Sequence, residues 1–207
     1  MHRRSQLVVL SGPAGSGKTT LAEQYRVRFP NIRRVVTATT RSPRMGERDG
    51  EDYYFLTRDD FEAGVRSNRF VEFTQFNGQY YGTPRDALDR AMAGDGAVLL
   101  VIEVDGAESI RFFFPDAVFV FVVPPGPGLL RRRLEGRGTE SPQEVDRRLD
   151  IARRELARLE EYDFLVVNND LDQAISDLDA ILRVTRRSRI VGGEAAAWEA
   201  GEFSDWK

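Results

Sequence analysis

Cysteine is absent from this chain, and histidine occurs once, as His2. Without cysteine the protein forms no disulfide, has no thiolate nucleophile and binds no cysteine-ligated zinc, which suits a reducing compartment. A lone histidine beside a chain end is a poor catalytic candidate, because terminal residues are usually poorly ordered. Any metal must therefore be held by oxygen ligands, which favours Mg²⁺.

Long hydrophobic runs and a strong charge of one sign are also missing. No stretch approaches the roughly 18 apolar residues of a membrane span, and residues 1–6 lack the apolar core of a signal peptide. The net charge is -3, which argues against a general nucleic-acid-binding surface. We therefore expect a cytoplasmic protein that binds neither membrane nor nucleic acid. The 207 residues, 41% of them hydrophobic, fit one globular domain with insertions.

The most informative segment is rich in glycine and lies between two apolar patterns. It follows the run Leu7–Leu10 and opens a helical pattern over Lys18–Phe29, so a turn joins a strand to a helix there. Such a turn directs backbone N–H groups and a helix N-terminus at a phosphate. The segment reads Gly12, Pro13, Ala14, Gly15, Ser16, Gly17, Lys18 and Thr19. This G-x-x-x-x-G-K-[ST] pattern predicts a nucleoside triphosphate site, with the lysine on the β- and γ-phosphates and the threonine hydroxyl on Mg²⁺.

Short, nearly continuous apolar runs alternate with amphipathic segments along the chain. The runs are typical of strands that are covered on both faces. They are Leu7–Leu10, Val98–Val104, Ala117–Val123 and Phe164–Val167, and the helical patterns are Lys18–Phe29, Asp86–Met92, Ala107–Phe113, Leu129–Leu134 and Leu171–Val184. This alternation predicts an α/β fold with a parallel sheet at its core.

Two insertions interrupt this alternation. Residues 37–83 contain strand-like pieces and predict a small β-rich unit, whereas residues 126–160 are rich in arginine and helical in pattern. The core would then consist of residues 1–36, 84–125 and 161–190. Residues 191–207 form a tail whose aromatic side chains either dock on the protein or a second subunit, or stay mobile.

The first insertion carries a candidate second anion site. Arg41 and Arg44 flank Pro43 in the segment Thr39-Thr40-Arg41-Ser42-Pro43-Arg44, where two guanidinium groups can bind phosphate oxygens. An arginine pair is more often a solvated turn. The hydroxyl groups of Tyr53, Tyr80 and Tyr81 favour the anion site here.

A carboxylate in the same insertion is a candidate for base recognition. In the segment Phe70-Val71-Glu72-Phe73, strand alternation places Glu72 opposite Val71 and Phe73. A carboxylate only accepts hydrogen bonds, so it suits the N1–H and amino group of guanine. An exposed strand glutamate is an equally good interpretation.

Arginines of the second insertion could lie over a transferring phosphoryl group and stabilise its negative charge. Interleaved acidic residues favour a salt-bridged surface helix for most of them. The set comprises Arg131, Arg132, Arg133, Arg137, Arg147 and Arg148.

Taken together, these segments resemble guanylate kinase from about Leu7 to Arg187. The resemblance rests on Gly12–Thr19, Thr39–Arg44 with Gly46-Glu47 and Gly50–Tyr53, Phe70–Phe73, Tyr80–Thr83, Arg133–Glu140 and Val167–Asp170. It implies a three-layer P-loop NTPase fold with a GMP-binding domain near 37–83 and a lid near 126–160. It also implies the reaction ATP + GMP → ADP + GDP with Mg²⁺, in a monomer or a homodimer.

The resemblance also implies roles for individual residues. It places Arg41, Arg44, Tyr53 and Tyr81 on the GMP phosphate, and Thr37, Glu72, Thr83 and Glu103 at the guanine. It places Lys18, Arg137 and Arg148 around the transferring phosphoryl group with Arg133 close by, Thr19 on Mg²⁺, and Asn168 on the adenine side of the ATP site.

The segment Val101-Ile102-Glu103-Val104-Asp105-Gly106 departs from the family pattern Asp-x-Asp-x-Gln-Gly. Either Glu103 serves both metal and guanine, or Thr19, phosphates and water hold the metal. Two alternatives therefore stay open: a kinase of the same fold with another acceptor, and a non-catalytic guanylate-kinase-like binding module.

Overall fold

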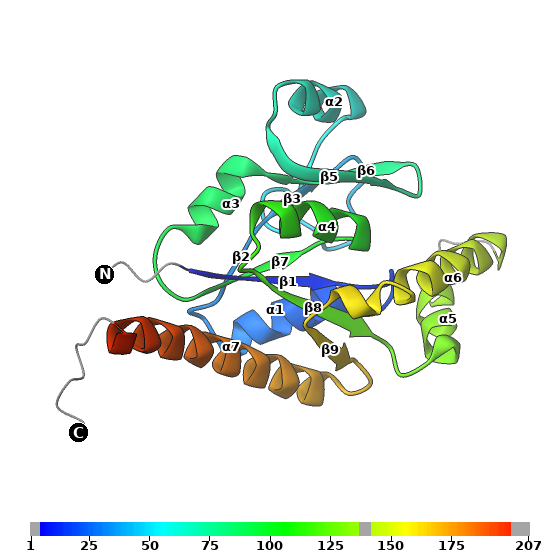
Figure 1. The fold of residues 1–207 in the computed structure, drawn as a ribbon. Coiled ribbons are helices and arrows are strands. Elements are labelled where there is room, and N and C mark those ends of the chain that lie inside the picture. The colour runs from blue at the N-terminus through cyan, green and yellow to red at the C-terminus, as the bar shows by residue number, and fades with distance from the viewer. Residues whose placement is uncertain (1–4, 137–141, 200–207) are drawn as a thin grey trace.

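A computed structural model describes residues 5–136 and 142–199, with the side chains of the last helix described as far as Thr185. At its centre is a five-stranded sheet in the order β2-β7-β1-β8-β9, in which every neighbouring pair is parallel (Figure 1). The strands are β1 (Gln6–Ser11), β2 (Arg33–Arg34), β7 (Ala97–Val101), β8 (Val118–Val123) and β9 (Phe164–Val167).

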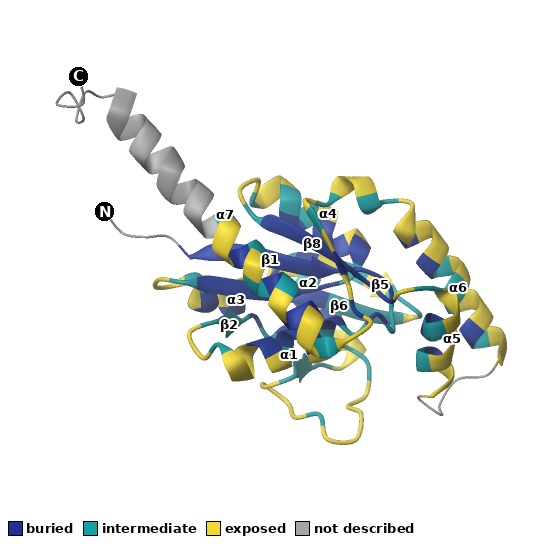
Figure 2. Ribbon diagram, turned by 90° about the horizontal axis from the view of Figure 1, so that it is seen from below, coloured by how far each residue is buried: buried dark blue, intermediate teal, exposed yellow. Residues whose placement is uncertain are grey.

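Helices cover both faces of this sheet, which explains why its three central strands are largely apolar. Every residue of β1, β7 and β8 is buried (Figure 2). The helices α1 (Lys18–Arg28) and α7 (Leu171–Glu199) pack on one face, and α3 (Arg85–Met92) and α4 (Val104–Phe113) pack on the other. The predicted α/β class with a parallel sheet core is confirmed.

A second, four-stranded sheet lies on the α3–α4 side of the molecule (Figure 1). Its order is β4-β3-β6-β5, with β3 (Thr37–Thr39), β4 (Tyr53–Phe55), β5 (Phe70–Phe76) and β6 (Gln79–Pro84). Its helix α2 (Arg58–Arg66) is capped by Thr57, whose side chain accepts from the Asp60 N–H. Phe61 of α2 stacks on Phe70 and Tyr80, with ring centroids 4.3 and 5.1 Å away, and so joins the helix to the sheet.

The helices α5 (Pro127–Glu135) and α6 (Pro142–Leu156) project beyond the carboxyl ends of the core strands (Figure 1). They share a small apolar cluster around Leu130, Leu134 and Val145. A 3₁₀ turn, η1 (Leu159–Glu161), leads from α6 back to β9. There Arg158 forms ion pairs with Asp105 and Glu108 of α4, which fix the end of this insertion to the core.

Several element boundaries differ from the sequence prediction. The strand predicted over Val98–Val104 ends at Val101, and α4 begins at Val104 and not at Ala107. Helix α7 continues to Glu199 instead of ending near Val184, because the alanines at 195–197 favour helix and Gly192-Gly193 does not end it. Helix α6 ends at Leu156, before the end of the insertion 126–160 that was predicted to be helical. Arg137 and residues 200–207 lie outside the described part of the chain. Within that part, no helix has the length and apolar character needed to cross a membrane.

Candidate active site

The glycine-rich segment forms a tight loop between β1 and α1. Gly12, Gly15 and Gly17 have positive φ, with values of 133°, 89° and 91°. Gly17 precedes the first turn of α1, and a β-carbon there would lie 2.3 Å from Nδ2 of Asn168. Glycine is therefore required at this position both by backbone conformation and by space.

Two side chains brace this phosphate loop from outside. Nδ2 of Asn168 donates to the carbonyl oxygen of Ser16 at 2.8 Å. Arg133 of α5 donates to the same oxygen at 3.2 Å and to the carbonyl oxygen of Asn168 at 3.0 Å. Asn168 is 5% exposed, so its amide holds the loop and does not project into solvent. A cavity of about 360 Å³ beside this brace is lined by Gly15, Gly17, Thr20, Arg133, Asn168, Asn169 and Leu171.

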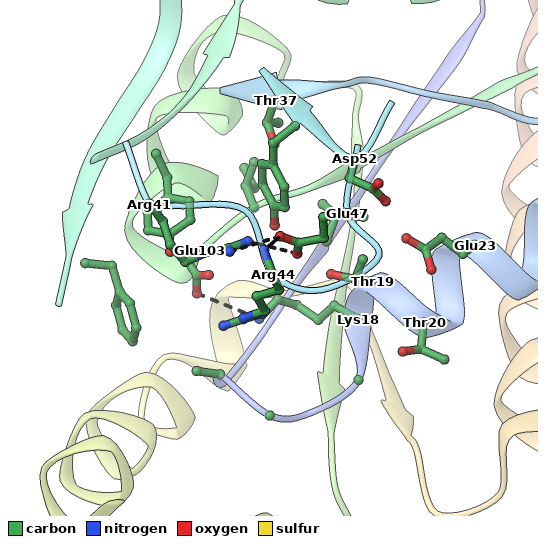
Figure 3. A pocket seen from close by; sticks show the side chains of 18 of the residues that line it. Lys18, Thr19, Thr20, Glu23, Thr37, Arg41, Arg44, Glu47, Asp52 and Glu103 are labelled. Carbon is green, nitrogen blue, oxygen red and sulfur yellow. Dashed lines mark hydrogen bonds and ion pairs between the residues drawn. The ribbon is translucent and has the colours of Figure 1, made fainter. Parts of the chain in front are cut away.

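Lys18 points along the inner side of the loop. Its Nζ donates to the carbonyl oxygens of Gly12 and, at 3.2 Å, Pro13. The same atom lies 3.7 Å from Oε2 of Glu103, which caps α4 (Figure 3). The ammonium group is thus buried at the point where the phosphate loop meets the end of β7.

A larger cavity of about 440 Å³ runs from the phosphate loop to the second sheet (Figure 3). Most of the predicted site residues line it, although they come from separate segments of the chain. They are Ala14, Gly15, Gly17, Lys18, Thr19, Thr37, Arg41, Arg44, Tyr53, Glu72, Tyr81, Glu103 and Arg148. One space therefore brings the loop, the β-rich insertion and α6 together.

Glu72 is buried at the wall of this cavity, with 4% of its surface exposed. The interpretation of an exposed strand glutamate is therefore wrong. The pairing of β5 with β6 shifts between Phe70 and Glu72, and the hydroxyl of Thr83 donates to Oε1 of Glu72 at 2.6 Å. Burial raises the pKa of Glu72 to about 7, with the negative charge of Glu103 adding to the effect.

Arg41 is held in place by a carboxylate that sequence reasoning did not assign. Its guanidinium donates to both oxygens of Glu47, at 2.9 and 3.0 Å, and lies over the ring of Tyr53. Burial alone would raise the pKa of Glu47, but hydrogen bonds from Arg41 and from the Arg44 backbone lower it. Arg41 and Glu47 are six positions apart, with Pro43 and Gly46 in the turn between them. This short separation was the only sequence feature that could have indicated the pair.

Tyr80 does not join the anion site that the sequence predicted for it. Its ring stacks on Phe61, and its hydroxyl accepts from Arg58 at 3.3 Å. Tyr80 and Tyr81 are consecutive residues of β6, so their side chains lie on opposite faces of the sheet.

The arginines of α5 and α6 divide into two groups. Arg131 pairs with Glu135 and Asp146 at the surface, and Arg132 and Arg147 are exposed, as the salt-bridged helix predicts. Arg148 instead lines the main cavity, with 12% of its side chain exposed and its Nε 3.7 Å from Oε1 of Glu144.

The carboxylates of Glu103 and Glu155 both lie near Lys18. Oε2 of Glu103 accepts no hydrogen bond among the described residues, and Val101 leaves the neighbouring position apolar. Glu155 of α6 is 9% exposed, and burial together with the charge of Glu103 raises its pKa to about 7. The residues described here contain no group of three carboxylates or imidazoles that could hold a metal ion.

A braced phosphate loop at the carboxyl ends of a parallel sheet opens on a cavity lined by arginines, tyrosines and a buried carboxylate. Fold and site together define a nucleoside monophosphate kinase of the P-loop class. Residues 4–185 match the guanylate kinase family model, and the chain belongs to the guanylate kinase family.

Individual relatives agree with this. The chain is 42% identical to the guanylate kinase of Desulfitobacterium hafniense over 192 residues, which cover 90% of this chain and 96% of that protein. It is 44% identical to the guanylate kinase of a Synechocystis species over 175 residues, covering 84% and 92%. The crystal structure of guanylate kinase from Anaplasma phagocytophilum superposes with a TM-score of 0.70 at 30% identity, covering 89% of this chain and 88% of that one.

Proposed function

We propose that this chain transfers a phosphoryl group from ATP to GMP, and also to dGMP, in the cavity between the phosphate loop and the second sheet. The observation that carries this proposal is the position of Glu72. It is a buried carboxylate in the wall of a cavity that also contains the phosphate-loop lysine. The membership of the guanylate kinase family supports the same reaction.

The acceptor nucleotide would lie against the second sheet. Glu72 would accept from N1–H and the amino group of guanine, with Thr83 fixing its other oxygen. Thr37 and Glu103 line the same cavity. The GMP phosphate would be bound by Arg41, Arg44, Tyr53 and Tyr81, of which Arg41 is already oriented by Glu47.

The donor phosphates would lie in the loop of residues 12–19, with the adenine beside Asn168 and Arg133. Lys18 and Arg148 would stabilise the charge that develops on the transferred group, because both line the cavity. Arg137 is proposed for the same role on its resemblance alone. GMP is already an anion, so its phosphate oxygen attacks without a strong general base.

The residues at the loop fit a Mg²⁺ ion that is held mainly by phosphates and water. Thr19 lines the cavity with a hydroxyl, and Oε2 of Glu103 is a buried oxygen that accepts no hydrogen bond from the part of the chain that the structure describes. These are oxygen donors, as Mg²⁺ prefers, and they are too few to form a site without the nucleotide. When bound, the ion would neutralise charge on the phosphate oxygens.

We also propose that the three parts of the chain act as separate units. The core would be residues 1–36, 84–125 and 161–190, the GMP-binding domain 37–83, and the lid 126–160. The brace between Arg133 and the carbonyl oxygen of Ser16 would keep the base of the lid in register with the phosphate loop. Closure of the lid would exclude water from the transferring group.

An acceptor panel tests the assignment. GMP, dGMP, IMP, AMP and ribose 5-phosphate are each supplied with ATP and Mg²⁺, and ADP release is followed in a coupled assay. We expect the highest kcat/KM with GMP, a lower value with IMP, which lacks the amino group, and little turnover with AMP. A preference for AMP or for the sugar phosphate would overturn the assignment of the acceptor, and no turnover with any acceptor would favour a binding module.

A further inference from the structure

One contact spans the gap between the second sheet and the lid. Cζ of Arg148, on α6, lies 6.0 Å from the ring centroid of Phe76, on β5. Both residues line the main cavity, which also contains Lys18. An aromatic ring and a guanidinium group at this separation attract each other through the quadrupole of the ring. The contact therefore joins two units that are more than 70 residues apart in the chain.

The sheet side of this contact is stiff. Phe76 pairs with Gln79 as the last pair of the β5–β6 hairpin. The two residues between them, Asn77 and Gly78, have φ values of 49° and 75°, which is the left-handed pair of a tight type I′ turn. The backbone of Phe76 is therefore held by paired strands up to its own position, and it moves together with the hairpin.

The lid side is partly fixed as well. Arg148 follows Glu144 by one helical turn, with Nε 3.7 Å from Oε1 of that residue. Its side chain is 12% exposed, so most of the guanidinium is shielded from water. Shielding strengthens the attraction between a cation and a ring face.

Arg148 contacts an aromatic ring, whereas Arg41 is oriented by a carboxylate. Glu47 orients Arg41 through two hydrogen bonds and so engages the donors of that guanidinium. A ring face uses none of the five N–H donors of an arginine. Phe76 can therefore orient Arg148 while the N–H groups of Arg148 bind phosphoryl oxygens.

We propose that Phe76 is a positioning residue, which places Arg148 over the transferring phosphoryl group when the acceptor-binding sheet is in its bound position. This rests on the proposed role of Arg148 in phosphoryl transfer. Glu72 lies on the same strand as Phe76, so acceptor binding at one end of β5 is transmitted to the ring at the other. The hairpin thereby makes the placement of the lid arginine depend on the acceptor.

The test compares Phe76→Leu with Phe73→Leu in the full chain. Phe73 is on the same strand, is 48% exposed, and has its ring against Phe61, away from the lid. Loss of a shielded cation–ring contact predicts that Phe76→Leu lowers kcat about three- to tenfold. The KM values for GMP and ATP should change less than twofold, and Phe76→Tyr should retain the kcat of the native chain. An unchanged kcat in Phe76→Leu, or an equal loss in Phe73→Leu, would overturn the proposal.

A double-mutant cycle separates this proposal from the role of Arg148 itself. Arg148→Ala should lower kcat strongly, and Phe76→Leu should have no further effect in that background. If Phe76→Leu lowers kcat by the same factor with and without Arg148, the ring acts by another route and the positioning role is wrong. If Arg148→Ala leaves kcat unchanged, the proposed role of Arg148 is wrong and the role of Phe76 is lost with it, whereas the acceptor panel still stands.

Discussion

The hydroxyl of Thr83 donates a 2.6 Å hydrogen bond to the carboxylate of Glu72, and both side chains are buried beside the main cavity. The bond fixes one carboxylate oxygen, and we propose that the other accepts from the base of the acceptor nucleotide. In Glu72→Gln the hydrogen bond from Thr83 is kept, but a donor amide replaces the second acceptor oxygen. We expect the KM for GMP to rise about 10- to 100-fold, the worth of a hydrogen bond to a charged group. The KM for ATP should stay nearly the same. Equal effects on both nucleotides in steady-state assays would remove Glu72 from the base pocket.

The buried carboxylate also makes stability depend on pH. The folded pKa of Glu72, about 7, is above the ordinary value of 4.5, because of burial and the facing charge of Glu103. Below about pH 4.5 Glu72 is protonated in both the folded and the unfolded chain, so its ionisation does not change the free energy of unfolding. Between about pH 4.5 and 7 Glu72 ionises only in the unfolded chain. The free energy of unfolding therefore falls by up to about 3 kcal/mol as pH rises through this range.

Urea unfolding of the native chain and of Glu72→Gln checks this. The pKa of Glu155 is raised in the same direction, but its contribution cancels in the difference between the two proteins. We expect Glu72→Gln to be the more stable protein at about pH 8 and the two to converge near pH 4.5. A difference that does not change with pH would show that Glu72 ionises normally in the fold.

The sequence predicted the parts of this site that depend on local pattern. The phosphate loop and the four apolar core strands are each specified by neighbouring residues. Both predictions are confirmed, although the strand predicted to reach Val104 ends at Val101. The strands β2 and β3 were not predicted, since they have only two and three residues and owe their conformation to pairing with distant strands.

The supporting contacts of the site could not be predicted for the same reason. The brace between Asn168 and Ser16 spans 152 positions in the chain, and no local pattern indicates it. Asn168 was assigned to the adenine side from resemblance, and the structure adds its hydrogen bond to the loop. The burial of Glu72 depends on α4, which approaches β5 closely only because Gly106 has no side chain. The sequence offered burial and exposure of Glu72 as equal alternatives.

Gly106 offers a second way to test the position of Glu72. A β-carbon at Gly106 would lie 2.5 Å from Oε2 of Glu72, which forces the carboxylate to move. We expect Gly106→Ala to raise the KM for GMP about tenfold and to leave the KM for ATP unchanged. The matched control is Gly128→Ala, which is also in a helix. Among the described residues, no atom other than those of its chain neighbours and of the backbone of its own helix would lie within 4 Å of a β-carbon there. If both variants behave alike, the effect comes from helix propensity and not from Glu72.

Arg133 should affect the donor nucleotide and not the acceptor. Its guanidinium donates to the carbonyl oxygens of Ser16 and Asn168 at the same time, at 3.2 and 3.0 Å. Lysine keeps the charge but lacks the planar fork that reaches both oxygens. We expect Arg133→Lys to raise the KM for ATP about three- to tenfold, with the KM for GMP within twofold. Arg132→Lys, at an exposed neighbouring position, serves as the control. A selective loss of GMP affinity in Arg133→Lys would contradict the brace.

Lys18 offers the sharpest test of the chemistry, because the chain has only two lysines, Lys18 and Lys207. Lys18 is 8% exposed, and its ammonium group lies between the carbonyl oxygens of the phosphate loop and Oε2 of Glu103. A positive charge in such a shielded place stabilises the developing charge of phosphoryl transfer far more than it would in water. Lys18→Ala should therefore lower kcat by about 10²–10³ or more, with the fold retained in circular dichroism. Lys207→Arg should turn over like the native chain. Near-native kcat in Lys18→Ala, measured by coupled ADP release, would show that the loop binds a nucleotide without taking part in phosphoryl transfer.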